Sequence, residues 1–180
     1  MPGRRMTNDE LAEVYHRYHD MVYRIALVQT RQQSLAEDIQ QEVFLALVRH
    51  SDRIRDGEHL KAWLIRVTQN ACRKHFRSFW VRRTVSYDDA LAKEDPDGGG
   101  PPLPEEAAQD AEAEEEETEI VREAVEELPP DRRIVVHLFY YEEMPVREIA
   151  RSLGITESSA KTRLSRARDQ LREILKRRNE

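Results

Sequence analysis

The sequence has few of the residues that stabilise extracellular domains or bind metals. Its single cysteine, Cys72, cannot form an internal disulfide and has no partner at metal-ligand spacing, so we expect it to pack between helices. The six histidines form no His-Glu-x-x-His pattern, and there is no glycine-rich phosphate loop. No apolar run approaches the length of a membrane span, and no signal segment is recognisable. We therefore expect a soluble cytoplasmic protein that is not an enzyme and has no cofactor, no metal and no stable membrane insertion.

The formal net charge of −6 is the sum of three blocks of different sign. Residues 1–84 carry a net charge of +5, residues 85–127 carry −15 and residues 128–180 carry +4. The two basic blocks suit contact with nucleic acid, whereas a polyanion would repel the acidic block between them. The charge pattern thus predicts two nucleic-acid-facing modules joined by a linker.

Proline, glycine and acidic residues mark that linker. The segment 95–104 is dominated by proline and glycine and cannot continue a helix. The run 105–119 is too acidic and too poor in large apolar residues to fold alone. We expect residues 85–117 to be flexible, with 112–117 available as the leading end of the next helix, because carboxylates favour a helix N-terminus. A solvated spacer is the simplest interpretation of this acidic run.

The first block has the pattern of three helices. Thr7 and Ser34 each begin a Ser/Thr-x-x-Glu capping box, which predicts two helix starts, and a third helix is expected from about His59 to Arg77. Helical spacing of apolar residues predicts the buried face of each helix. The expected inward residues are Leu11, Val14, Tyr15, Tyr18, Val22, Ile25 and Ala26 in the first helix, Ile39, Val43, Phe44, Leu47 and Val48 in the second, and Leu60, Trp63, Leu64, Val67, Ala71 and Phe76 in the third.

The last block contains the pattern of a helix-turn-helix. Gly154 stands where the chain must take a left-handed conformation, and Thr156 caps the helix that follows. The surface of that helix carries short hydroxyls and long basic side chains, which reach base edges and phosphates in a major groove. The alternative is an ordinary surface hairpin of helices. The apolar residues behind this interpretation are Val146, Ile149, Ala150 and Leu153, then Ala160, Leu164, Ala167 and Leu171, after an earlier helix containing Ile120, Val121, Val125 and Leu128.

Aromatic and basic residues alternate along the third helix of the first block. A surface that holds unstacked bases needs aromatic faces for stacking and cations for phosphates. Trp63 fits a core position better than a base platform, whereas the pair Phe79 and Trp80 fits either use equally. The candidate residues for single-stranded DNA on this helix are Trp63, Arg66, Asn70, Arg73, Lys74 and Arg77.

These segments resemble a known family. The segments 36–47 and 61–70 look like region 2 of a bacterial RNA polymerase sigma factor of the extracytoplasmic-function (ECF) group, and 128–133 with the helix-turn-helix resembles region 4. The two matches leave out little but the linker and occur in the right order. The resemblance implies an all-α fold of two small helical domains, region 2 at 7–84 and region 4 at 118–180, joined by the flexible acidic linker 85–117.

The resemblance also implies a role for each surface. The implied function is to bind core RNA polymerase and direct promoter-specific initiation: region 2 melts the start-proximal promoter DNA, and region 4 reads the upstream element. Core polymerase would contact Asp38, Gln41 and Glu42, with Val43 and Phe44 packed behind them. Opened promoter DNA would bind the six residues of the third helix given above. The duplex upstream element would be read by Ser158, Lys161, Thr162, Arg163, Ser165 and Arg166.

Two other interpretations remain open at this stage. A free-standing helix-turn-helix repressor or activator would use the first block as a dimerisation bundle, but it would have no reason to carry the 38–44 segment. In related factors the linker threads through the channel that nascent RNA later occupies, so the resemblance favours RNA mimicry by the acidic run over a plain spacer. The resemblance also raises an anti-sigma factor as a further partner, which the sequence neither requires nor excludes.

Overall fold

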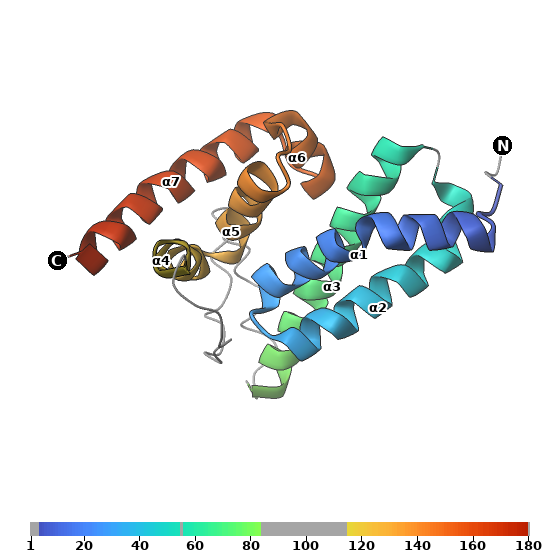
Figure 1. Ribbon diagram of the computed structural model, residues 1–180, viewed down its shortest axis with the longest axis horizontal. Helices are drawn as coiled ribbons and strands as arrows, with labels where there is room; N and C mark the ends of the chain where they lie inside the picture. Colours follow the sequence, from blue (N-terminus) through green and yellow to red (C-terminus); the bar gives the residue numbers. More distant parts are fainter. Residues whose placement is uncertain (1–3, 55, 84–114, 180) are drawn as a thin grey trace. The chain divides into compact units, whose positions relative to one another are not determined.

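Two helical units form the part of the computed structural model that describes residues 4–54, 56–83 and 115–179. The first unit, blue to green in Figure 1, contains α1 to α3, and the second, yellow to red, contains α4 to α7. Every regular element in these ranges is helical, which confirms the all-α expectation. Most of the expected linker lies outside the described residues, and its last three residues, 115–117, belong to the first turn of α4.

The first unit is a bundle of three helices. It consists of α1 (Asn8–Thr30), α2 (Gln33–His50) and α3 (Gly57–Arg83), with the short 3-10 turn η1 (Ser51–Arg53) after α2. Each helix packs against the other two, so each contributes an apolar stripe to one shared core. The apolar residues that are at most 1% exposed in this core are Val22, Ile25, Ala26, Ala36, Ile39, Val43, Leu47, Leu64 and Ile65.

Two residues expected in that core lie at the surface. Tyr15 is 44% exposed and Val48 is 50% exposed. Tyr15 packs edge-on against the half-buried Phe44, with 4.9 Å between the ring centroids. The expectation was wrong because a bundle of three helices covers only part of the circumference of each helix, and helical spacing alone does not show where that cover ends.

Of the two capping boxes predicted in the first unit, one is present in the structure and the other is not. Thr7 caps α1 as expected: its Oγ1 accepts a hydrogen bond from the Glu10 amide at 3.2 Å, and the Glu10 carboxylate accepts one from the Thr7 amide at 2.7 Å. The capping box expected at Ser34 is wrong, since α2 begins at Gln33 without a side-chain cap. Only two residues separate α1 from α2, so α2 begins before Ser34, and Ser34 lies inside its first turn.

The second unit packs four helices and a wide turn. These are α4 (Glu115–Glu126), α5 (Pro130–Val136), the π-helical turn η2 (His137–Tyr141), α6 (Val146–Leu153) and α7 (Glu157–Asn179). The long α7 packs against both α5 and α4. The core of the second unit includes Leu128, Ile134, Leu138, Ile149, Ala160, Leu164 and Ala167. Ile120 and Val121, expected to mark the apolar side of α4, are exposed, whereas Ala124 and Val125 are buried.

A buried arginine fixes the corner between α4 and α5. Arg133 is 3% exposed, and its Nη2 donates hydrogen bonds to the carbonyl oxygens of Glu126 at 3.0 Å and Leu128 at 2.8 Å. Carbonyl groups at the end of a helix have no partner within that helix, so this guanidinium stabilises the end of α4. The corner in turn sets where α5 begins.

Three further properties bear on function. Cys72 is buried and unpaired, as expected, and burial raises the pKa of its thiol to about 12. Among the residues that the structure describes, no group of three His, Cys, Asp or Glu side chains could hold a metal ion. Within the same ranges, no helix combines the length and the apolar character needed to cross a membrane.

Candidate functional site

The turn between α6 and α7 has the local structure that the sequence predicts. Gly154 takes φ 69°, the left-handed region that favours glycine, and the Ile155 amide donates to the Ala150 carbonyl at 3.0 Å. Thr156 Oγ1 accepts a hydrogen bond from the Ser159 amide at 3.0 Å, which confirms the expected cap. The helix-turn-helix is therefore held by its own turn and cap, and the first turns of α7 are available at the surface.

One exposed face of α7 carries short polar side chains and one amine. Ser158, Lys161, Thr162 and Ser165 follow a helical spacing of three and four and are all exposed. The Thr162 hydroxyl donates to the Ser158 carbonyl at 2.9 Å. We call these four residues the α7 face; it combines three small hydroxyl side chains with one flexible amine.

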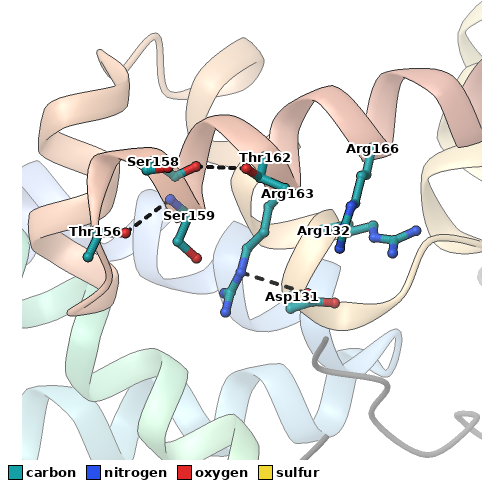
Figure 2. Close-up of a pocket in the computed structure, with 8 residues that line it drawn as sticks. All are labelled: Asp131, Arg132, Thr156, Ser158, Ser159, Thr162, Arg163 and Arg166. Carbon is teal, nitrogen blue, oxygen red and sulfur yellow. Dashed lines mark hydrogen bonds and ion pairs between the residues drawn. The ribbon is translucent and has the colours of Figure 1, made fainter. Parts of the chain in front are cut away.

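A pocket of about 310 Å³ borders this face, between the start of α7 and the start of α5. Figure 2 shows arginines from both helices around it, with hydroxyl groups along the α7 side. Three arginines and one aspartate give the lining a net positive charge, which suits an anionic group. The residues that line the pocket are Asp131, Arg132, Thr156, Ser158, Ser159, Thr162, Arg163 and Arg166.

Arg163 does not share the α7 face. Its side chain is only 23% exposed, and its Nε lies 3.8 Å from Oδ2 of Asp131, a side chain that is 14% exposed. Burial raises the pKa of the Asp131 carboxyl, although the nearby Arg163 and Arg132 charges oppose that shift. The structure thus separates Arg163 from the other five residues predicted to read the upstream element, because its guanidinium is paired with α5.

The basic residues predicted on α3 form an exposed stripe. Arg66, Asn70, Arg73, Lys74 and Arg77 are exposed, and their spacing places them on one side of the helix. We call these five residues the α3 stripe. Trp63 lies at its start and is half-buried, so part of the indole packs in the bundle. The side chains of Phe79 and Trp80, the other predicted aromatic pair, lie outside the described residues.

The predicted polymerase-binding residues divide into an exposed and a covered set. Asp38 and Gln41 are exposed on α2, whereas Val43 is buried and Phe44 is half-buried. Two large apolar residues that were not among the predicted contacts are also exposed on α2: Leu45, 56% exposed, and Val48, which the sequence analysis placed in the core. Spacings of three, four and three join Asp38, Gln41, Leu45 and Val48 into one stripe, which we call the α2 face.

Glu42 joins α2 to α3. Its carboxylate contacts Nζ of Lys74 at 3.2 Å and accepts from Nε2 of His75 at 3.3 Å. Burial opposes ionisation of Glu42, but the hydrogen bonds from Lys74 and His75 outweigh it and hold the pKa of this carboxyl below its usual value. Glu42 thus lies at the border between the α2 face and the α3 stripe, with its charge already paired.

Comparison with known proteins identifies the two units. The family model for Sigma-70 region 2 matches residues 14–82, and the model for Sigma-70, region 4 matches residues 118–171. The ECF RNA polymerase sigma factor SigM of Bacillus subtilis is 30% identical over 165 residues, which cover 92% of this chain and 94% of that protein. The chain belongs to the ECF group of sigma-70 family sigma factors. The sigma factor BldN of Streptomyces coelicolor is 29% identical, and its match covers 88% of this chain and 58% of BldN.

Solved structures of sigma factors share the fold. RpoE from Bartonella quintana, solved in complex with the anti-sigma factor NepR, matches with a TM-score of 0.70 at 23% identity, over 93% of this chain and 98% of RpoE. CnrH, solved with the cytosolic domain of CnrY, matches with a TM-score of 0.64 at 19% identity, over 94% of this chain and 90% of CnrH. At these identities the two structures are evidence for the fold.

Membership of the family decides the question of function class. The sigma factor directs transcription initiation through regions 2 and 4 and is not an enzyme. The match to region 2 also removes the repressor or activator alternative, because it covers the bundle that such a regulator would use for dimerisation.

Proposed function

We propose that the α2 face binds core RNA polymerase. Asp38 and Gln41 supply polar groups, while Leu45 and Val48 supply apolar area that the sigma factor itself leaves uncovered. An apolar centre with polar neighbours is the usual composition of a protein interface. Val43 and Phe44 support the face from inside the bundle, and Glu42 borders it. Because Glu42 is paired with α3, Asp38 is the carboxylate that the α2 face presents to a partner.

Promoter DNA is assigned to two other surfaces. The α3 stripe offers cations for the phosphates of the melted strand near the start site, with Trp63 at its edge. The α7 face enters the major groove of the upstream element as duplex. The observation that carries this assignment is the exposed, capped start of α7, where four small or flexible polar residues share one face.

Replacing one residue of the α7 face tests the upstream assignment. Lys161→Ala should weaken binding to a duplex carrying the upstream element by about 1–3 kcal/mol and relax the preference at one base pair, since an amine in the groove reads a base edge. The element is first selected from a random duplex pool with the full-length chain. Lys176→Ala, at an exposed position near the end of α7, is the matched control. Equal affinities for the two variants would remove Lys161 from the site.

The proposal extends to location and regulation. A factor that binds polymerase and DNA acts in the cytoplasm of a bacterium, so we place the protein there. RpoE and CnrH were each captured with a protein partner, RpoE with an anti-sigma factor. An anti-sigma protein is accordingly the proposed regulator of this factor, and the α2 face is available to such a partner as well as to polymerase.

A further inference from the structure

We propose that Arg168 of α7 is a further DNA-binding residue, which the π-helical turn η2 holds in place for a backbone phosphate of the upstream duplex. Arg168 is not among the six residues predicted to read the upstream element, and η2 lies before the helix-turn-helix in the sequence. The inference rests on the proposed DNA-binding role of the α7 face. It adds a contact at the edge of that face and a residue of η2, Tyr140, that positions it.

Two aromatic side chains of η2 hold the Arg168 guanidinium. Its Nε donates a hydrogen bond to the hydroxyl of Tyr140 at 2.8 Å. The guanidinium carbon lies 5.4 Å from the ring centroid of Phe139 and 5.7 Å from that of Tyr140, within the range of a cation–π interaction. Three contacts therefore orient this exposed arginine before any ligand binds, which lowers the conformational entropy that binding costs.

These contacts leave the charge of Arg168 available. Aromatic rings attract a cation but do not neutralise it, and no carboxylate among the residues that the structure describes forms an ion pair with Arg168. The neighbouring acid, Asp169, is paired with Arg172 instead, at 2.8 Å. The hydrogen bond from Nε leaves the donors on both Nη atoms for a ligand. An oriented arginine fork of this kind fits a phosphate in geometry as well as in charge.

The place of Arg168 on α7 indicates a phosphate at the edge of the groove. Arg168 follows Lys161 by seven residues, so it lies two turns further along the same edge of the helix. The first residues of a recognition helix contact the base edges. A straight helix of 23 residues, about 35 Å long, cannot follow a groove that winds once around the duplex in about the same distance. The turns that follow the base contacts must therefore pass the sugar-phosphate backbone, where a contact fixes the register of the helix and is independent of base sequence.

The first test removes the charge. Arg168→Met is compared with the full-length wild-type chain on the upstream duplex and on an unrelated duplex across a salt series. Losing one phosphate contact should lower the magnitude of the slope of log affinity against log salt by about 1 and weaken both duplexes roughly tenfold at about 0.1 M salt. Arg177→Met is the matched control and should change neither quantity, because Arg177 of α7 lies 3.9 Å from Glu127 of α4, away from the α7 face. Circular dichroism checks that each variant keeps its helical content.

The second test addresses the positioning role of Tyr140. Tyr140→Phe removes the hydroxyl that orients Arg168 but keeps the ring and every charge. The affinity for both duplexes should therefore fall about two- to fivefold, as for the loss of one hydrogen bond, while the salt slope stays at its wild-type value. In the Arg168→Met background the same change should have no further effect, because no arginine is left to orient. A hydroxyl that only stabilised the fold would act equally in both backgrounds.

Three results would overturn the inference: Arg168→Met behaves like Arg177→Met, its loss of affinity is confined to the upstream element, or Tyr140→Phe weakens binding equally with and without Arg168. A wild-type chain that binds the two duplexes equally well would instead contradict the proposed function, while its salt slope would still report on Arg168.

Discussion

Asp38→Arg should abolish copurification of the sigma factor with core RNA polymerase while leaving its helical content unchanged. Asp38 is exposed at one end of the α2 face, beside Gln41 and one helical turn from Glu42. An arginine at this position replaces a carboxylate at the interface by a cation that has no partner there. At a desolvated contact this lowers the binding free energy by about 2–5 kcal/mol. The measurement is co-elution of tagged variant and untagged core enzyme on gel filtration, supported by circular dichroism.

The control for this prediction is a matched charge reversal on the same bundle. Glu13 is exposed on α1, two residues from Tyr15 and hence on nearly the opposite side of that helix. Glu13→Arg should leave copurification intact, because it makes the same change in net charge away from the α2 face. Retention of polymerase by Asp38→Arg, or its loss from Glu13→Arg, would show that polymerase binds elsewhere.

Ile149→Ala should strongly destabilise region 4 and leave the stability of region 2 unchanged. Ile149 is fully buried on α6, and truncating a buried isoleucine costs about 2–5 kcal/mol. A small domain has only about 5–15 kcal/mol of free energy of unfolding in total, so the loss is a large share of the stability of region 4 and raises the fraction of unfolded region 4. Hydrogen exchange should therefore rise along α5 to α7 and stay unchanged along α1 to α3. The variant should bind the upstream duplex more weakly and keep its binding to polymerase.

A conservative variant at the same site is the control for this prediction. Ile149→Val removes one methylene and should cost about 0.5–1.5 kcal/mol, which leaves region 4 folded and the upstream duplex bound. If Ile149→Ala also raised exchange in α1 to α3, the two units would not fold independently, and the division of labour between them would need revision.

Local signals in the sequence predicted the elements that depend on local physics. The cap at Thr7, the cap at Thr156 and the left-handed Gly154 each depend on a few neighbouring residues, and all three are present in the structure. The box at Ser34 failed because the tight connection after α1 decides where α2 begins. The π-helical turn η2 has no simple signature in composition or spacing, and the sequence analysis did not predict it.

Helical spacing in the sequence did not predict contacts between different helices. The pairings of Glu42 with Lys74, Arg163 with Asp131 and Arg132 with Gln170 each join different helices. Helical periodicity places a side chain on a face but does not show which partner meets it. That is why the sequence grouped Glu42 with Asp38 and Arg163 with Arg166.

The sequence analysis did not predict the exposed apolar residues of the α2 face, for a different reason. Val48 was assigned to the core because apolar residues at helical spacing usually face inward. Leu45 lies on the same stripe as Asp38, so the sequence did carry a signal: an apolar residue on an otherwise polar face. An exposed leucine alone means little, whereas one aligned with a candidate docking segment indicates a partner surface.

Reconstituted transcription tests the central claim most directly. The full-length chain is added to core RNA polymerase and a library of bacterial promoter fragments, and transcript starts are mapped. The account predicts starts at a defined distance from a common upstream element. These starts should be lost with Asp38→Arg, and Lys161→Ala should relax the preference at one base pair of the element. Transcription that shows no such element, or that does not depend on the added chain, would contradict it.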